Sequence, residues 1–240
     1  MKKSGGTPWY WFIAGLVRNF IFPILGGIFV HGRENIPESG PLLVTPIHLS
    51  HIDPPLIGCI CTRALRFMAK KELFTFWLGP LIRSLGAFPV SRGDGDSGAI
   101  RTALEELKAG NALIMFPEGR RGDAQNIQRL EPGVMMLAKR SNAAVLPVGI
   151  SGSQRMLPRG SFFPKRHRVT VVFGEPFHYQ DFVHEGRSDK ETRELFMAEL
   201  EERIVSACKE AGLDLAAHPT PKSVSERSSQ TSDSPHESST

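Results

Sequence analysis

Two kinds of hydrophobic segment follow one another along the chain. Short, continuous apolar runs bounded by Gly and Pro are typical of strands covered on both faces. Segments whose apolar residues recur every three or four positions are typical of helices. The expected strands lie within 26–31, 41–47, 65–70, 86–92, 111–122, 143–152 and 168–177. The expected helices lie within 9–30, 54–64, 71–85, 96–110, 131–142 and 189–212, with Pro80 bending or splitting the third.

Because strands and helices alternate along the chain, the sequence predicts an α/β fold. We expect a mostly parallel central sheet flanked by helices, with an N-terminal helix segment at a membrane interface. The predicted organisation is a membrane-associated helical segment at 1–30, a folded domain at 31–215 and a tail at 216–240. The tail is rich in Ser, Thr, Pro and His and almost lacks apolar residues, so we expect it to be disordered.

The segment 9–30 is apolar but is a poor candidate for a membrane-spanning helix. Arg18, Asn19 and Pro23 interrupt it, whereas a spanning helix needs about 20 apolar residues without a central charge. It also lacks the small-residue cleavage site of a signal peptide. Aromatic residues at one end favour a helix that lies in the membrane interface, or a shallow re-entrant hairpin. The alternative is an N-terminal helix that packs on the protein core.

Composition narrows the classes of partner. The chain has 240 residues and a formal net charge of +4. A mildly basic protein suits a membrane surface, a phosphorylated substrate or a nucleic acid, and charge alone does not choose among them. Cys59, Cys61 and Cys208 form neither a disulfide framework nor a zinc-binding spacing. We interpret them as small buried hydrophobic residues in a reducing, cytosolic environment.

Charged and small polar residues follow four of the expected strands. They are IHLSHID at 47–53, SRGDGD at 91–96, FPEGRRGD at 116–123 and GISGSQR at 149–155. In an open α/β sheet, ligands bind beyond the carboxyl ends of the strands. The four loops are therefore the candidate site.

His48 and Asp53, spaced as H-x4-D before a helix, are candidates for a general base and its orienting carboxylate. The carboxylate would accept from one ring nitrogen, and the other nitrogen would take a proton from a hydroxyl. His51 is two residues from Asp53 and fits this geometry less well. No G-x-S-x-G motif is present, so the base is expected to activate a hydroxyl of the substrate. Alternatively, Asp53 only caps the helix as its N-cap residue, with Pro54 at the first helical position, and His48 is a surface residue.

The third loop has the composition of a phosphate site. FPEGRR at 116–121 places a carboxylate beside a glycine and two arginines. Guanidinium groups in a Gly-rich loop suit a phosphate. Arg92 ends the segment GAFPVSR in an equivalent place and is a further candidate phosphate ligand.

Together, four blocks resemble, in order and spacing, those of the glycerolipid acyltransferases of the 1-acylglycerol-3-phosphate acyltransferase type. His48, Ser50 and Asp53 are similar to the N-H-x-S-x-x-D block of that family. GAFPVSR resembles its second block, FPEGRR its third, usually F-P-E-G-T-R, and LPVGI its fourth. The segments VHGRENIPESGP and AKKEL are similar to its flanking regions. The resemblance covers about 28–177.

The resemblance implies a reaction and a set of roles. His48 would deprotonate the acceptor hydroxyl and Asp53 would orient His48, and the hydroxyl oxygen would attack an acyl thioester without an acyl-enzyme. Further residues would hold the acceptor, the arginines on its phosphate: Arg92, Glu118, Gly119 and Arg121, with Lys70 a weaker candidate. The donor would be acyl-CoA or acyl-carrier protein, the acceptor lysophosphatidic acid and the product phosphatidic acid. No metal or other cofactor is expected.

The sequence departs from the family at two positions. Ile47 stands where Asn is frequent, and Arg120 stands where Thr is usual. These changes leave open another lysolipid acceptor, or a non-catalytic lipid-binding protein of the same fold. Arg120 would either add to phosphate binding or face solvent.

Lipid substrates imply work at a bilayer surface. The residues 153–168 surround two phenylalanines with basic side chains, which suits either contact with anionic headgroups or an ordinary solvated loop. We expect membrane lipids as partners, at the cytoplasmic face of the inner (plasma) membrane. A nucleic-acid partner is not expected, because no recognisable binding module is present.

Overall fold

The computed structural model describes residues 3–90 and 97–216. Its centre is a sheet with the strand order β1-β7-β6-β2-β5-β3-β4. All neighbouring strands are parallel except β6 and β7, which are antiparallel. The predicted α/β fold with a mostly parallel sheet is therefore confirmed. The strands are β1 (Ile28–His31), β2 (Leu42–Pro46), β3 (Leu65–Lys70), β4 (Ala87–Val90), β5 (Ala112–Ile114), β6 (Ala144–Ser151) and β7 (Val169–Phe173).

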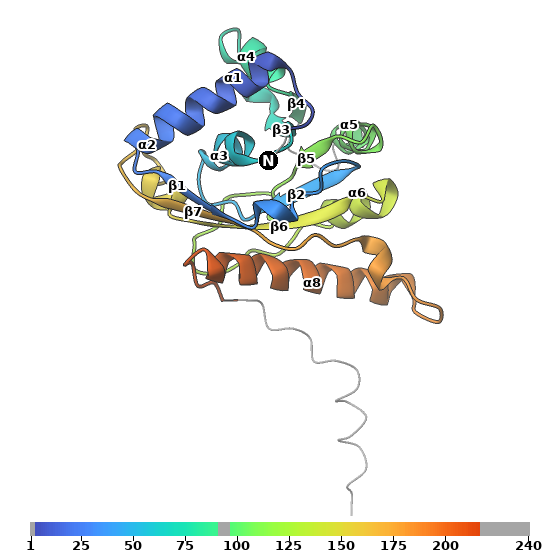
Figure 1. Ribbon diagram of the computed structural model, residues 1–240. Helices are drawn as coiled ribbons and strands as arrows, with labels where there is room; N and C mark the ends of the chain where they lie inside the picture. The colour runs from blue at the N-terminus through green and yellow to red at the C-terminus, as the bar shows by residue number, and fades with distance from the viewer. Residues whose placement is uncertain (1–2, 91–96, 217–240) are drawn as a thin grey trace, which may run out of the picture.

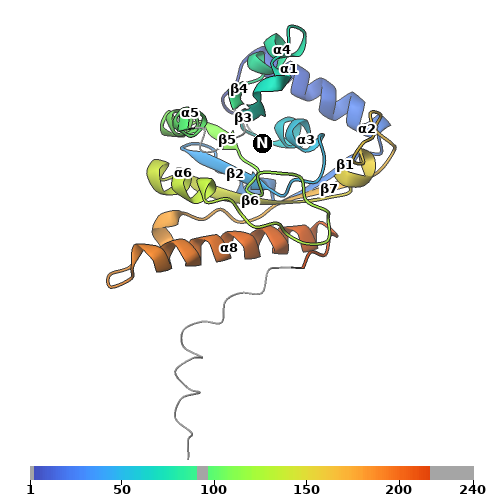
Figure 2. The ribbon, with the colours of Figure 1, turned by 180° about the vertical axis from the view of Figure 1, so that it is seen from behind.

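Helices cover both faces of the sheet. Figures 1 and 2 show α1 and α3 on one face and the long α8 on the opposite face. The α-helices of the described residues are α1 (Pro8–Leu16), α2 (Phe22–Ile24), α3 (Asp53–Ile60), α4 (Leu78–Ser84), α5 (Ser97–Lys108), α6 (Gly133–Ser141), α7 (Ser153–Met156) and α8 (Asp189–Glu210). Single turns of other helix types are η1 (Val17–Ile21), η2 (Arg33–Asn35), η3 (Lys71–Leu73) and η4 (Tyr179–Phe182).

The central strands are buried because the helices of both faces cover them. Every residue of β2 is buried, as are the first seven residues of β6. This explains why both strands are continuous apolar runs with no alternation. α8 begins at a capping box, in which Ser188 and Glu191 bond each other's backbone N–H groups. Its buried residues recur at helical spacing along the face that meets β6.

One predicted helix is shorter in the structure than in the sequence pattern. The segment 71–85 contains the turn η3 and then α4, which starts at Leu78. Pro80 is the third residue of α4, within its first turn. A proline is tolerated there because the first N–H groups of a helix have no partner within the helix. Pro80 thus lies at the start of the helix and does not divide one long helix.

The N-terminal segment forms a continuous helical stretch through α1, η1 and α2. Tyr10 and Ala14 face inward, and the Tyr10 hydroxyl donates to the carbonyl of Gly58 in α3 at 3.1 Å. Among the described residues, no helix combines the length and the apolar character needed to cross a membrane. β1 starts at Ile28 and pairs with β7, so the sheet includes the end of the segment 1–30. Of the predicted tail, 217–240 lies outside the described residues.

The contact between β6 and α8 generates a first prediction. A Cβ added to Gly149 would lie 2.2 Å from the carbonyl carbon of Ala207 and 2.4 Å from the backbone nitrogen of Cys208. Gly149→Ala should therefore lower the free energy of unfolding by at least about 1–3 kcal/mol, the usual cost of overpacking. Urea denaturation measures it.

Gly15→Ala in α1 is the matched control for this substitution. A Cβ at Gly15 has nothing within 4 Å. Alanine also has the higher helix propensity, so this variant should be as stable as the parent or more stable. Equal stability of the two variants would contradict the close packing of α8 on β6.

Candidate active site

The site lies where the neighbouring parallel strands β2 and β5 end. The loop 47–52 follows β2 and leads into α3, and the loop 115–123 follows β5. A cavity of about 1130 Å³ opens beside them. His48, Phe116 and Arg121 are among the residues that line it. The convergence of polar loops expected from the sequence is therefore present for these two loops.

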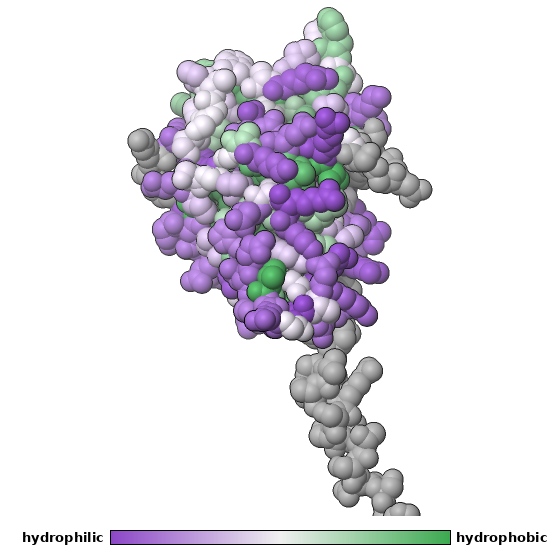
Figure 3. All heavy atoms as spheres, turned by 90° about the vertical axis from the view of Figure 1, so that its right-hand side faces the viewer, coloured by the Kyte–Doolittle hydropathy of each residue, from purple (hydrophilic) through white to green (hydrophobic). Residues whose placement is uncertain are grey.

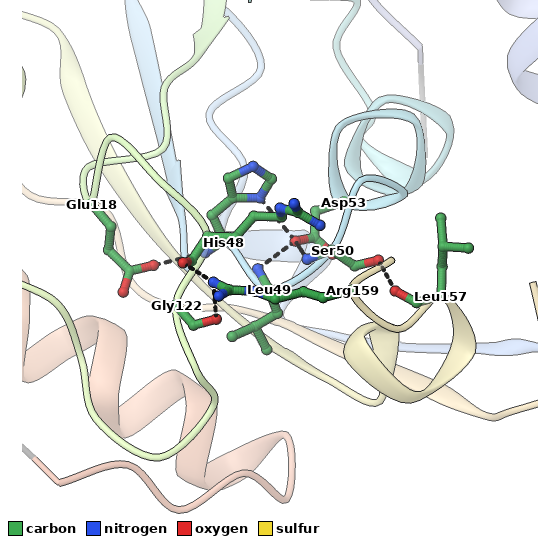
Figure 4. A network of polar contacts seen from close by, with 9 residues as sticks. His48, Leu49, Ser50, Asp53, Glu118, Gly122, Leu157 and Arg159 are labelled. Carbon is green, nitrogen blue, oxygen red and sulfur yellow. Dashed lines mark hydrogen bonds and ion pairs between the residues drawn. The ribbon is translucent and has the colours of Figure 1, made fainter. Parts of the chain in front are cut away.

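The His48 and Asp53 side chains point toward each other (Figure 4). His48 Nδ1 is 3.1 Å from Asp53 Oδ2, and the His48 side chain is 15% exposed whereas that of Asp53 is 0% exposed. The His48 ring also lies against Phe116, with 4.1 Å between the ring centroids. With Nδ1 held by the carboxylate, Nε2 is the ring nitrogen left for a proton from a ligand.

The Asp53 carboxylate also fixes the backbone of its own loop. Oδ2 accepts the backbone N–H groups of Leu49 and Ser50, both at 2.7 Å. Asp53 is the first residue of α3, and Ile52 is the N-cap residue, so the capping role expected for Asp53 is wrong by one position. The carboxylate bonds backward to the loop because the Leu49 and Ser50 N–H groups converge on it. These donors and the helix N-terminus stabilise a buried negative charge.

Glu118 lies behind His48. Its Oε2 accepts the backbone N–H of His48 at 2.9 Å, and its Oε1 accepts the N–H of Gln128 at 3.0 Å. Burial raises the pKa of the Glu118 carboxyl, and these two hydrogen bonds partly offset that rise. Glu118 is 3% exposed and is not among the residues lining the cavity. Its position supports the His48 backbone, and gives no support to the expected direct contact with the acceptor.

Three of the residues expected to hold the acceptor line the cavity, and a fourth lies outside the described residues. Lys70, at the end of β3, and Arg121 both line the cavity. Gly119 lines it as well and has a φ of 64°, in the left-handed region that favours glycine. Arg92 lies outside the described residues.

The rest of the cavity wall is mostly apolar. It is formed by β3, β4 and the segment from η3 to α4. The apolar side chains of this wall are those of Phe67, Met68, Leu73, Leu78, Ile82, Leu85, Ala87 and Val90. One cavity is therefore lined by His48, by cationic side chains and by a mostly apolar wall, a combination suited to an amphipathic molecule.

Three cavity residues were missed or undervalued by sequence reasoning. Arg120, expected to face either the phosphate or solvent, is exposed, lines the cavity and donates to Gln128 at 3.2 Å. His51 lines the cavity, and burial together with Arg121, His48 and Lys70 lowers the pKa of its imidazole. Arg159 lines the cavity from the segment after α7. No local sequence motif indicates a role for Arg159, because it contacts the loop 115–123, which is far away in the sequence.

Ile47, one of the two departures from the family pattern, is a core residue. It is 1% exposed, and its backbone N–H donates to Val148 at 3.1 Å. Its apolar side chain cannot form a hydrogen bond with the loop 47–52. The backbone of this loop is held instead by the carboxylates of Asp53 and Glu118.

Comparison with known proteins assigns the family. A family model described as Acyltransferase matches residues 27–151, just over half of the chain. The chain belongs to the acyltransferase family. This confirms the resemblance indicated by the four sequence blocks.

Relatives of known name cover most of the chain. The acyltransferase chain is 30% identical over 166 residues to the 1-acyl-sn-glycerol-3-phosphate acyltransferase of Bacillus subtilis, covering 68% of this chain and 80% of the relative. It is 32% identical over 187 residues to the protein of the same name in Streptococcus pneumoniae, covering 75% and 67%. The crystal structure of the 1-acyl-sn-glycerophosphate (LPA) acyltransferase PlsC of Thermotoga maritima matches with a TM-score of 0.70 and 27% identity, covering 86% and 81%.

The geometry of Asp53 generates a second prediction. In Asp53→Asn the amide oxygen can replace Oδ2 as acceptor for Leu49 and Ser50, but the negative charge beside His48 is lost. The melting temperature should change little, while kcat for acyl transfer falls by about 10⁴-fold, as for a comparable His–Asp pair. Thermal unfolding and steady-state kinetics measure the two effects. A variant that retains wild-type kcat would show that the charge plays no part.

Proposed function

We propose that this chain is a 1-acyl-sn-glycerol-3-phosphate O-acyltransferase. It would transfer an acyl group from a thioester to the sn-2 hydroxyl of lysophosphatidic acid, which gives phosphatidic acid. The observation that carries the proposal is that His48, held by Asp53, lines the same cavity as cationic side chains and an apolar wall. The printed names of the relatives support the choice of acceptor.

The contacts of His48 support a role as general base. Nε2 takes the proton of the sn-2 hydroxyl as the hydroxyl oxygen bonds to the carbonyl carbon of the thioester. The imidazolium is stabilised by Asp53 at 3.1 Å. The carbon–sulfur bond then breaks, and the imidazolium gives the proton to the leaving thiolate. The products are an ester and a free thiol, and no covalent enzyme intermediate forms.

The cavity lining supports an acceptor that combines phosphate and hydrocarbon. Lys70 and Arg121, with Arg92 as a further candidate, would bind the phosphate, and the apolar wall would bind an acyl chain. Gly119 would allow the loop to approach the acceptor closely, and Glu118 would hold the loop on His48.

The thioester donor would be acyl-CoA or acyl-carrier protein. The reaction needs no metal or redox cofactor, because the imidazole supplies the base and the thioester is already an activated acyl group.

An exposed apolar surface supports work at a bilayer. The outer side of α1, η1 and α2 carries large apolar side chains that are at least 41% exposed; five of them are Trp9, Phe12, Leu16, Phe20 and Ile24. A helix on the surface of a protein in water normally turns polar residues outward. In Figure 3, hydrophobic residues also stand at the upper tip of the molecule, at the height where Figure 1 places α4, above a largely hydrophilic side. We call the five residues the N-terminal apolar face.

A second exposed element adjoins the end of α2. Phe162 and Phe163 are 94% and 82% exposed, and Lys165 and Arg166 follow them. The His167 backbone N–H donates to Leu25 at 2.7 Å, so this loop lies next to the N-terminal helices. Exposed phenylalanines beside basic side chains suit an anionic membrane surface. The proposed location is the cytoplasmic face of the inner membrane, which agrees with the three free, buried cysteines.

The mechanism generates a third prediction. Purified protein with oleoyl-CoA and lysophosphatidic acid should form phosphatidic acid and free CoA in equal amounts. His48→Ala should lower kcat by about 10²–10⁴-fold, the range for removal of a general base. His51→Ala, in the same loop, should lower it less than tenfold, since the Asp53 carboxylate contacts His48.

Other lysolipids serve as the control for the acceptor. Lysophosphatidylcholine and monoacylglycerol, offered at the same concentration, should be poorer acceptors than lysophosphatidic acid. A better rate with either lipid would reject the proposed acceptor, and equal losses in His48→Ala and His51→Ala would reject the proposed base. Absence of thiol release with every pair would favour the non-catalytic lipid-binding alternative.

The N-terminal apolar face generates a fourth prediction. The double substitution Phe12→Asp and Phe20→Asp places two charges on this face and should greatly reduce co-sedimentation with vesicles that contain phosphatidylglycerol. Leu195→Asp is the matched control, because Leu195 is an exposed apolar residue of α8 on the opposite side of the sheet (Figure 1). Equal binding by all three proteins would show that the face does not bind membranes.

A further inference from the structure

We propose that Arg159 is a positioning residue. It holds the loop 115–123, which carries Arg121, against the loop 47–52, which carries His48 and is called the catalytic loop below. The inference rests on the proposed function for its kinetic consequence, but its structural basis is separate. Arg159 belongs to the segment between α7 and β7, outside all four blocks that resemble the family. Its guanidinium reaches across to the loop that follows β5 (Figure 4).

The contacts of Arg159 are with backbone carbonyl groups. One guanidinium nitrogen, Nη2, donates to the carbonyl of Gly122 at 2.9 Å and also to the carbonyl of Arg121. Hydrogen bonds from a charged donor are stronger than those between neutral groups. Arg159 therefore restrains two successive peptide units of the loop.

The peptide between Arg121 and Gly122 is held at both ends. Its carbonyl oxygen accepts from Arg159, and its N–H donates to the carbonyl of His48 at 2.7 Å. The carbonyl and the N–H of a trans peptide point in opposite directions, so the two bonds fix the orientation of the peptide plane. Guanidinium, peptide and His48 carbonyl form one hydrogen-bonded chain, in which each bond polarises the next.

Fixing this peptide fixes the point from which the Arg121 side chain extends into the cavity. His48 has other supports, because Asp53 holds its ring and Glu118 holds its N–H. Loss of Arg159 should thus affect phosphate binding more than the base. Binding that is equal in the ground state and the transition state appears in KM and leaves kcat unchanged.

The segment of Arg159 is also tied to the catalytic loop at a second point. The Ser50 hydroxyl donates to the carbonyl of Leu157 at 2.9 Å. Leu157 and Arg159 precede the exposed Phe162 and Phe163 by a few residues. The loop that we propose to touch the membrane is therefore joined through short stretches of backbone to the loop 47–52 and to the loop 115–123.

The kinetic test compares Arg159→Ala, Arg159→Lys and Arg155→Ala. Arg155 is exposed on α7, just before the segment of Arg159, and is the matched control. Arg159→Ala should raise KM for lysophosphatidic acid about tenfold, from the usual strength of hydrogen bonds to charged groups, with kcat changed less than threefold. Arg159→Lys keeps one cation and should give an intermediate KM. Arg155→Ala should leave both constants unchanged.

A structural readout is independent of the reaction. Hydrogen exchange followed by mass spectrometry should show faster exchange in the peptide 116–124 of Arg159→Ala, because the Gly122 N–H is less well held, and no change in Arg155→Ala. If Arg159→Ala does not fold, Arg159→Lys and Arg159→Gln provide the same comparisons.

The outcomes separate this inference from the proposed function. If the wild-type protein fails to acylate lysophosphatidic acid but Arg159→Ala still exchanges faster than the wild type at 116–124, the function is rejected and the role of Arg159 is retained. An unchanged KM, a loss confined to kcat, or unchanged exchange at 116–124 would overturn the role of Arg159.

Discussion

The site depends on one buried oxygen atom, Oδ2 of Asp53. Three nitrogen atoms surround it: the backbone nitrogens of Leu49 and Ser50 and Nδ1 of His48. A carboxylate removed from water is stable only if donors replace its lost hydration. The three donors all converge on Oδ2, whereas Oδ1 is buried without a hydrogen-bond partner among the described residues. The contacts of Oδ2 therefore set the fold of the loop and the orientation of the imidazole together.

The two loops of the site are held as one unit. His48 donates its N–H to Glu118 and accepts the N–H of Gly122, so both of its backbone groups are bound by the loop after β5. The neighbouring strands β2 and β5 end beside each other, and this adjacency brings the base and the cationic loop together. Buried Glu118 therefore acts by holding the loop in place. The positive charge of the cavity lining comes from Lys70, Arg120, Arg121 and Arg159, and Asp123 adds one carboxylate.

Sequence reasoning recovered the elements whose signal is local. The apolar pattern predicted seven strand segments, and each strand of the described residues lies within one of them. The H-x4-D spacing selected the histidine that contacts the carboxylate. The antiparallel placement of β7 was not predictable, because the connection from β6 contains a loop whose path depends on tertiary contacts. Arg159 was missed for the same reason, since its partners lie 37 and 38 residues away. The family resemblance named Glu118 as a site residue, but only the folded structure shows that its oxygens accept backbone N–H groups.

The pairing of β1 with β7 has a consequence for the order in which the protein forms. β1 lies at the edge of the sheet, and Ile28 pairs with Val169, so the N-terminal strand cannot join the sheet until most of the chain has been synthesised. Domains form during synthesis from the N-terminus onward, and contacts between distant segments form late. During that interval the helices before β1 are not held by their strand, and their apolar side chains are accessible. The topology therefore leaves the N-terminal segment without its sheet partner until late in synthesis.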